Sequence, residues 1–249
     1  MQNGANPKNA VHWFMNSKGG VGKSHTAVYL TQAYQAAGLP VVAIDADATS
    51  ATFSSFKGLG VRRVNIMQGD KINERIFDNI VEEILTKESN FVIDTGASAF
   101  VELSRYFNRN GIPNHITEAG RRFVANVIIT GGATFNETSL NLKSMAEQMP
   151  PAVEIVVWLN QHFGPIGDGS RSFEELEIYK MTADRIKAIV KLDDHTFSEA
   201  ATYGVDVKLM MSKGLTFREV RQSPDFTLMA KHRLHLLERE VIEKIRAVI

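Results

Sequence analysis

The sequence of 249 residues contains no cysteine. Disulfide bonds, thiolate metal sites and cysteine-ligated iron–sulfur clusters are therefore excluded. No apolar run approaches the roughly 20 residues that a membrane-spanning helix needs, and the N-terminus lacks an apolar stretch of signal-peptide length. We therefore expect a cytoplasmic protein with no integral membrane contact.

An excess of charge of either sign is also missing, because 28 Lys and Arg residues balance 28 Asp and Glu residues. No overall field draws such a chain to nucleic acid or to an anionic membrane, so either partner would need a local patch. Hydrophobic residues make up 44% of the chain, which suffices for one large core. We expect a single domain over residues 1–249, with a flexible N-terminal tail over residues 1–10.

Short apolar runs that are typical of buried strands alternate with helical patterns. The apolar runs lie at residues 11–15, 41–44, 91–93, 124–129 and 154–159, and the clearest helical patterns lie at 25–37, 73–87, 133–148 and 226–248. This alternation predicts an α/β fold, with a doubly wound, mostly parallel sheet flanked by helices. An irregular glycine-rich segment, residues 161–172, follows the last of these strands, at the end where open α/β sheets bind ligands.

A glycine-rich loop, SKGGVGKS at residues 17–24, joins the first strand to the first helix. Strand, glycine loop and helix follow one another in the order that a phosphate-binding P-loop requires. The glycines let the backbone wrap around phosphate oxygens, and the new helix points free amide groups at them. We expect Lys23 to bridge the β- and γ-phosphates of ATP and the Ser24 hydroxyl to ligate Mg²⁺.

The stretch KGGVGKS resembles the deviant Walker A motif of the ParA/MinD family of dimeric ATPases, P-loop NTPases of the SIMIBI class. The resemblance implies a slow ATPase that forms a homodimer around ATP, in which Lys18 reaches the phosphates of the partner's nucleotide. An ordinary P-loop needs only Lys23, so Lys18 has no obvious task within a monomer. A second cation beside the γ-phosphate can stabilise the charge that develops during phosphoryl transfer.

Two of the apolar runs end in acidic residues. Asp45 and Asp47 follow the second run and, as alternate residues, point to opposite sides of the chain. By resemblance to the family's switch I pattern, Asp47 orients or deprotonates the attacking water and Asp45 lies nearer the Mg²⁺ ligands, although Ala48 replaces the usual proline. Asp94 ends the third run as a Walker B acid does, and we expect it to hold Mg²⁺ through water or through Ser24. Capping of a strand end is the alternative role for Asp47 and Asp94.

Asn160 resembles the family's base-reading asparagine, whose amide can pair with the edge of adenine. The expected nucleotide-binding residues are therefore Lys18, Gly19, Gly20, Val21, Gly22, Lys23, Ser24, His25 and Asn160. The expected catalytic residues are Lys18, Lys23 and Asp47, and the expected metal ligands are Ser24, Asp45 and Asp94.

Several further segments resemble the TraL group of conjugal-transfer ATPases of plasmids. They are residues 51–53, VRRVNIM at 61–67 followed by Gly69-Asp70, IDTGAS at 93–98, and VVWLNQHFGPI at 156–166. This resemblance implies a role in plasmid transfer or maintenance, with a protein partner from such a system. A metabolic P-loop enzyme, with residues 161–172 at its substrate pocket, and a nucleotide-dependent adaptor in which Asp47 is idle remain as alternatives.

The last helical segment, residues 226–248, carries an apolar stripe made by Leu234, Leu237, Val241, Ile245 and Val248. Acidic residues dilute its polar face, so we interpret it as a core-packing helix rather than a membrane-surface helix. A possible basic strip consists of Lys213, Arg218, Arg221 and Arg233. We expect at most weak, non-specific DNA binding from it.

Overall fold

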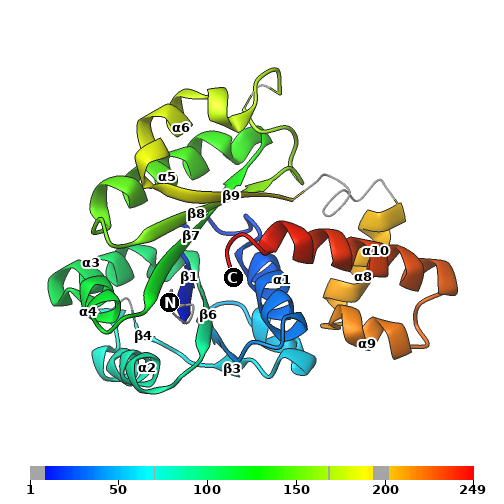
Figure 1. Ribbon diagram of the computed structural model, residues 1–249, viewed down its shortest axis with the longest axis horizontal. Coiled ribbons are helices and arrows are strands. Elements are labelled where there is room, and N and C mark those ends of the chain that lie inside the picture. The colour runs from blue at the N-terminus through cyan, green and yellow to red at the C-terminus, as the bar shows by residue number, and fades with distance from the viewer. Residues whose placement is uncertain (1–8, 70, 168, 193–201) are drawn as a thin grey trace, which may run out of the picture.

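A computed structural model describes residues 9–69, 71–167, 169–192 and 202–249. Its centre is a seven-stranded parallel sheet in the order β3-β2-β6-β1-β7-β8-β9 (Figure 1). The strands are β1 (Ala10–Phe14), β2 (Val41–Ala46), β3 (Arg62–Arg63), β6 (Asn90–Thr95), β7 (Arg122–Thr130), β8 (Glu154–Asn160) and β9 (Ile186–Leu192). The expected doubly wound α/β fold is confirmed. Residues 1–8 of the expected tail lie outside the described residues, and Ala10 already belongs to β1.

Helices cover both faces of this sheet (Figure 1). One face carries α1 (Lys23–Ala36), α8 (Thr202–Ser212), α9 (Phe217–Gln222) and α10 (Leu228–Ile245). The other face carries α2 (Glu74–Thr86), α3 (Phe100–Asn110), α4 (Ile112–Glu118), α5 (Phe135–Gln148) and α6 (Glu177–Thr182). Trp13 and Phe14, neighbours in β1, belong to the separate cores on these two faces, which is why the strand reads as a continuous apolar run.

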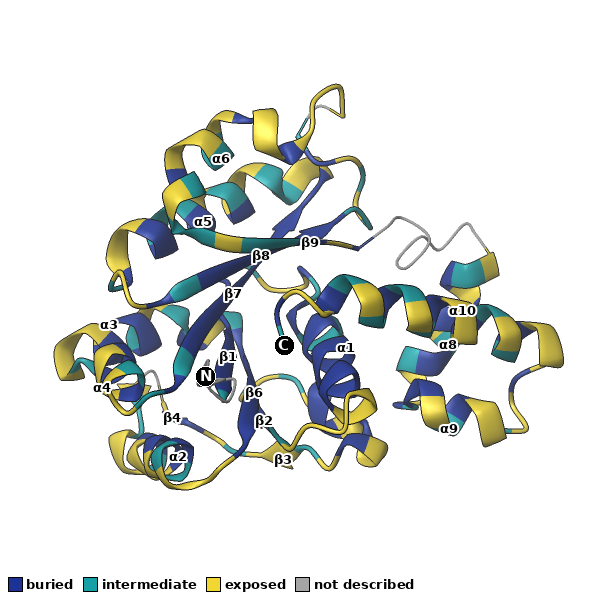
Figure 2. Ribbon diagram, viewed as in Figure 1, coloured by how far each residue is buried: buried dark blue, intermediate teal, exposed yellow. Residues whose placement is uncertain are grey.

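Shorter elements connect these layers. They are the hairpin β4 (Met67–Gln68) and β5 (Lys71–Ile72), and the 3₁₀ turns η1 (Phe53–Ser55), η2 (Lys57–Leu59), η3 (Ala97–Ala99), η4 (Gly132–Thr134), η5 (Phe173–Glu175) and η6 (Ala183–Arg185). Burial follows the layers (Figure 2): the inner strands β2, β6, β1, β7 and β8 are mostly buried, whereas the edge strand β3, much of the edge strand β9 and the outer helix faces are less buried or exposed. Within the described part of the chain, none of the helices has the length and apolar character needed to cross a membrane.

The stripe of α10 is buried against the α1 face of the sheet, so the interpretation as a core-packing helix is confirmed. Strand β9, which the apolar runs do not predict, lies at the edge of the sheet, and its Lys187 and Lys191 are exposed. Edge strands often carry lysines that discourage pairing with other chains, and these charges interrupt the apolar signal of the strand.

Candidate functional site

The sequence-predicted site residues lie together at the carboxyl edge of the sheet. Because the strands are parallel and in register, Phe14 of β1 and Asp45 of β2 both lie beside Asp94 of β6. Asn160 ends β8 beside Thr130 of β7. The P-loop leaves β1 at this edge and enters α1, so it lies between the acidic strand ends on one side and Asn160 on the other.

Neighbouring elements hold the start of the P-loop through side-chain hydrogen bonds. Asn16 donates to the Ile128 carbonyl of β7 and accepts from the amide of the same residue, both at 2.9 Å. Asn141 of α5 accepts from the Ser17 amide at 3.0 Å and donates to the Met15 carbonyl at 3.1 Å. The sequence reasoning missed both asparagines. Asn16 directly precedes the loop and could have been suspected, whereas Asn141 lies more than 100 positions away with no local signal.

Lys23 and Ser24 lie at the first turn of α1, beside Asp94. The Ser24 hydroxyl donates to Asp94 Oδ2 at 2.5 Å, and the buried Lys23 ammonium donates to the Lys18 carbonyl at 3.2 Å. Burial raises the pKa of Asp94 to about 7, against the opposing effects of the Ser24 hydrogen bond and the Lys23 charge. Burial also lowers the pKa of Lys23, while the charges of Asp94 and Asp47 raise it. The Lys23 side chain is thus largely removed from solvent.

Asp94 also fits a role in holding Mg²⁺. Its second oxygen, Oδ1, is buried and has no hydrogen-bond partner among the described residues. Leaving a carboxylate oxygen buried and unpaired is costly, so the arrangement suits a ligand that supplies the missing partner. Mg²⁺ is commonly held by one or two carboxylates together with waters and substrate phosphates. Ser24 and Asp94 are placed to provide the protein's share.

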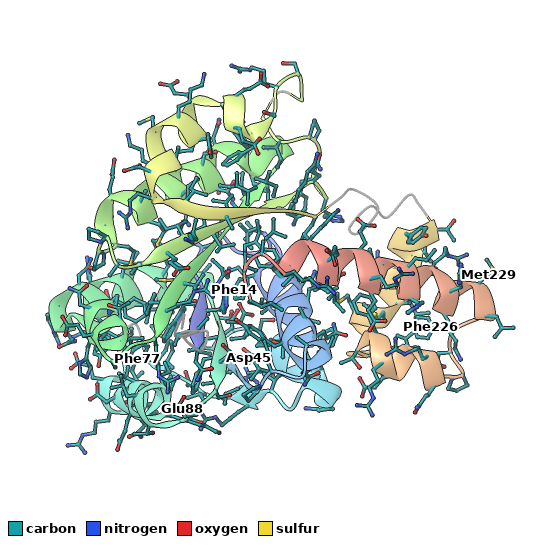
Figure 3. All side chains as sticks on the ribbon, in the orientation of Figure 1. Phe14, Asp45, Phe77, Glu88, Phe226 and Met229 are labelled. Carbon is teal, nitrogen blue, oxygen red and sulfur yellow. The ribbon has the colours of Figure 1, made fainter. Side chains whose placement is uncertain are left out.

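The two acids at the end of β2 differ in surroundings. Asp45 is fully buried in the interior (Figure 3) and accepts from the amides of Asp47 at 3.1 Å and Ser54 at 2.8 Å. Asp47 is half-buried, and its Oδ1 accepts from the Thr49 amide at 2.8 Å and the Thr49 hydroxyl at 2.7 Å. Both acids therefore organise the loop that follows β2, and for Asp47 this is the capping role that the sequence left open.

Asp47 nevertheless lies beside the Walker B segment. A Cβ atom on Gly96, two residues after Asp94, would come within 2.6 Å of Asp47 Oδ1. Only glycine permits so close an approach between the carboxylate and the backbone that follows Asp94. Asp47 therefore lies directly against the backbone that follows Asp94.

Asn160 supports the P-loop directly. Its Nδ2 donates to the Val21 carbonyl at 2.9 Å, and its Oδ1 accepts from the His162 amide at 3.0 Å. Nδ2 also lies 2.9 Å from where a Cβ atom on Gly22 would be, and Gly22 has φ of 102°, a conformation that glycine adopts easily. Asn160 thus fixes the loop, and it also lines the space beside the P-loop.

That space is a cavity of about 370 Å³ beside the P-loop. Its lining residues are Gly20, Gly22, His25, Asn160, His162, Phe163, Gly204, Val207, Lys208, Met211 and Ser212. Burial lowers the pKa of His25, and the nearby His162 adds to the effect. The wall from α8 was missed because Tyr203, Val205, Val207 and Leu209 alternate with other residues in a strand-like pattern.

The glycine-rich segment 161–172 contributes His162 and Phe163 to this same cavity. Its Asp168 lies outside the described residues. The segment packs on the loop after β7, where a Cβ atom on Gly131 would come within 2.0 Å of the Gly164 carbonyl oxygen. The segment is therefore a wall of the cavity beside the P-loop.

Lys18 has a partner within its own chain, which the sequence did not predict. Its Nζ lies 2.8 Å from Glu137 Oε2 in the first turn of α5, and both side chains are about half exposed. The neighbouring Asn141, one helical turn along α5, holds Ser17. One face of α5 therefore contacts two consecutive residues at the front of the P-loop.

The basic strip considered from the sequence is largely neutralised. Lys213 pairs with Asp225 at 2.8 Å, Arg221 with Glu238 at 2.5 Å, and Arg233 with Asp206 at 2.7 Å. These pairs offset the positive charge of three residues of the strip, and the fourth, Arg218, is exposed on α9.

Comparisons with known proteins identify a family for the chain. Residues 13–246 match the family model described as CobQ/CobB/MinD/ParA nucleotide binding domain. Two proteins from Escherichia coli described as Protein TraL are 37% and 36% identical to the chain, covering 95% and 94% of it and 97% and 96% of their own lengths.

Solved structures share the fold at low sequence identity. A ParA family ATPase from Chlorobium tepidum TLS superposes with a TM-score of 0.52 at 14% identity, covering 94% of this chain and 99% of its own. The MinD cell division protein of Aquifex aeolicus gives a TM-score of 0.50 at 14% identity, covering 94% and 97%.

Proposed function

Since the chain belongs to the CobQ/CobB/MinD/ParA nucleotide-binding family, we propose that it binds ATP with Mg²⁺ and hydrolyses it slowly as a nucleotide-switched dimer. The observation that carries this proposal is the contact between Ser24 and Asp94 at the start of α1, with Asp94 Oδ1 buried and unpaired among the described residues. Lys23, partly desolvated beside them, supplies the phosphate-binding cation.

Each residue of the site then has a physical task. The amides of the P-loop and of the first turn of α1 bind the phosphates, and Lys23 contacts the β- and γ-phosphates. Ser24 and Asp94 would hold Mg²⁺, which when bound neutralises charge on the phosphate oxygens. Asp47, held against Gly96, orients or deprotonates the attacking water. The adenosine part occupies the cavity between Asn160, Phe163 and α8.

Lys18 is assigned to the partner subunit's ATP. Within one subunit it pairs with Glu137 on the surface, and such exposed pairs contribute only about 0.2–1 kcal/mol. Exchanging a carboxylate for the triphosphate of a second subunit therefore costs little and gains a stronger charge interaction. In a two-fold symmetric dimer each subunit gives one lysine and receives one.

Binding and assembly can be tested separately. Calorimetry with ATP and Mg²⁺ should detect binding to the wild type and severe weakening in Lys23→Ala. Sedimentation with ATP should detect a dimer for the wild type and a larger dimer fraction for Asp47→Ala, because that variant no longer activates water. Lys18→Ala should bind ATP but hydrolyse it poorly. Unchanged affinity in Lys23→Ala contradicts the nucleotide site, and monomeric wild type and Asp47→Ala at micromolar concentration contradict the dimer.

We further propose that the switch serves conjugative transfer or maintenance of a plasmid, through a protein partner that recognises the ATP dimer. Support comes from the two TraL proteins, which are 37% and 36% identical to the chain over 95% and 94% of its length. A pull-down from cells that carry the plasmid, with Asp47→Ala as bait and Lys23→Ala as the matched control, tests this. A plasmid-encoded transfer or partition protein retained only by Asp47→Ala supports the role, and its absence contradicts it.

A further inference from the structure

The loop that follows Asp47 packs against the turn between α8 and α9 at very short range. A Cβ atom on Gly214, in that turn, would come within 2.6 Å of the Ser55 carbonyl oxygen in η1. A Cβ atom on Gly58 would come within 2.6 Å of the Glu219 carboxylate in α9. The Gly214 contact involves backbone on both sides. Neither the turn nor η1 can therefore move away without displacing a whole backbone segment.

The turn is rigidly connected to the helices around it. The Gly214 amide donates to the Met211 carbonyl at the end of α8 at 3.0 Å. The Phe217 amide at the start of α9 donates to Gln32 Oε1 of α1 at 2.8 Å, and the Phe217 ring stacks on Tyr29 with centroids 5.8 Å apart. The end of α8 and the start of α9 therefore form one packed unit with the P-loop helix.

The same unit forms a wall of the nucleotide cavity. Val207, Lys208, Met211 and Ser212 of α8 all line the space of about 370 Å³ beside Asn160 and Phe163. Only Lys213 separates Ser212 from Gly214 along the chain. A base that fills the cavity and fixes this wall therefore also fixes the position of Gly214.

On the other side of the contact, Ser55 follows Ser54, which is hydrogen-bonded to Asp45. The amide of the neighbouring Ser54 donates to Asp45 Oδ2 at 2.8 Å, and Asp45 Oδ1 accepts from the Asp47 amide at 3.1 Å. A continuous series of contacts therefore links the α8 wall of the cavity to the backbone of Asp47. Asp45 is fully buried, so a displacement of Ser54 is passed on rather than absorbed by solvent.

We propose that Gly214 and Ser55 are positioning residues, through which the base bound against α8 sets the placement of the Asp45–Asp47 loop for hydrolysis. This inference rests on the proposed ATPase function. It makes the nucleoside part of the substrate necessary for fast hydrolysis as well as for affinity. Inorganic tripolyphosphate, which can occupy the P-loop but leaves the cavity against α8 empty, should be bound yet cleaved more slowly than ATP.

A matched pair of glycine variants isolates the contact. Gly214 and Gly60 have nearly the same backbone conformation, with φ of 61° and 64°, so alanine strains both alike. Nothing lies within 4 Å of a Cβ atom on Gly60, whereas one on Gly214 meets Ser55. Gly214→Ala should bind ATP with little change in Kd but lower kcat by roughly 10-fold or more, since small misplacements of reacting groups are costly. Gly60→Ala should keep both values close to those of the wild type.

A second measurement uses the wild-type protein, in case Gly214→Ala folds poorly. Amide hydrogen exchange over residues 51–60 should slow when ATP binds and change much less with tripolyphosphate at saturating concentration. Equal protection by the two ligands overturns the inference, as does equal kcat in the two glycine variants. If the wild type binds neither ATP nor tripolyphosphate, the nucleotide site itself is refuted. Failure of the proposed function is therefore distinguishable from failure of this inference.

Discussion

Lys18 forms an ion pair with Glu137 on the surface of its own subunit. The pair joins the front of the P-loop to α5 at 2.8 Å. If Lys18 must leave Glu137 to reach a second subunit, removing the carboxylate favours the dimer. Two exposed pairs, one from each subunit, together contribute about 0.4–2 kcal/mol, which corresponds to a dimerisation constant raised by about 2-fold to 30-fold.

The prediction is tested with Glu137→Gln in sedimentation runs at several protein concentrations with ATP and Mg²⁺. Glu147→Gln is the control, because Glu147 is also exposed on α5 and pairs with Lys143 at 3.9 Å. A dimerisation constant that is unchanged or lowered in Glu137→Gln, relative to this control, argues against Lys18 acting in the partner subunit.

His12 is a buried residue behind the P-loop whose titration makes a pH prediction. Its Nε2 lies 2.7 Å from the Tyr34 hydroxyl of α1, and its Nδ1 lies 3.4 Å from Asn126 of β7. Burial, with the charge of Arg122, lowers the pKa of His12 to about 3, although the Asn126 hydrogen bond opposes the shift. In the unfolded chain the pKa is near 6.5, so below that pH the unfolded state takes up the proton first.

The stability that His12 contributes by remaining neutral is therefore complete above about pH 6.5 and is lost as the pH falls toward 3. His12→Gln should be less stable at neutral pH, because it disturbs the contact with Tyr34, but its free energy of unfolding should fall less steeply between pH 7 and 5. Urea titrations across this range measure the slope. The control is His115→Gln, at an exposed histidine, which should keep the wild-type slope. Identical slopes for all three proteins rule out His12 as a source of the pH dependence.

At the scale of elements, α10 shows how one helix stabilises the nucleotide-binding face. Its apolar stripe packs in the core with α1, α8 and α9. Leu237 is 1% exposed and its neighbour Leu236 is 40% exposed, so the two leucines test burial within one turn of one helix. Leu237→Ala should cost about 2–5 kcal/mol of unfolding free energy, and Leu236→Ala well under about 1 kcal/mol.

Chemical unfolding of both variants measures this difference. Equal costs would indicate that α10 is not held in the core as described. A membrane-surface role would reverse the order for binding to anionic vesicles, since Leu236 would then be the residue that meets lipid.

At the scale of the whole molecule, balanced charge predicts weak contact with DNA. Net charge is zero, and Lys213, Arg221 and Arg233 are paired with acids. Binding to duplex DNA should be weak and independent of sequence, and should fade between roughly 50 and 200 mM salt. Fluorescence anisotropy with two unrelated duplexes checks this. Tight binding that survives high salt, or preference for one duplex, would show a DNA site that the ion pairs do not suggest.

The sequence by itself determined the features that depend on neighbouring residues. The order of strand, glycine loop and helix places Lys23 and Ser24 at a helix start, and apolar runs that end in Asp45, Asp94 and Asn160 put polar groups at strand ends. Parallel topology then carries all of these ends to one edge. Local rules suffice here because each signal spans only a few residues of backbone.

Only the tertiary structure decided which distant groups complete the site. Glu137, Asn141 and the α8 wall reach the P-loop from positions more than 100 residues away, and Gly214 meets Ser55 across a similar separation. Neither α8 nor β9 was predicted, because apolar residues alternate in a strand-like pattern in α8 and lysines interrupt the apolar run of β9. Packing overrides propensity in such segments, because the free energy of burying a face against the rest of the molecule exceeds the small local preference of the chain.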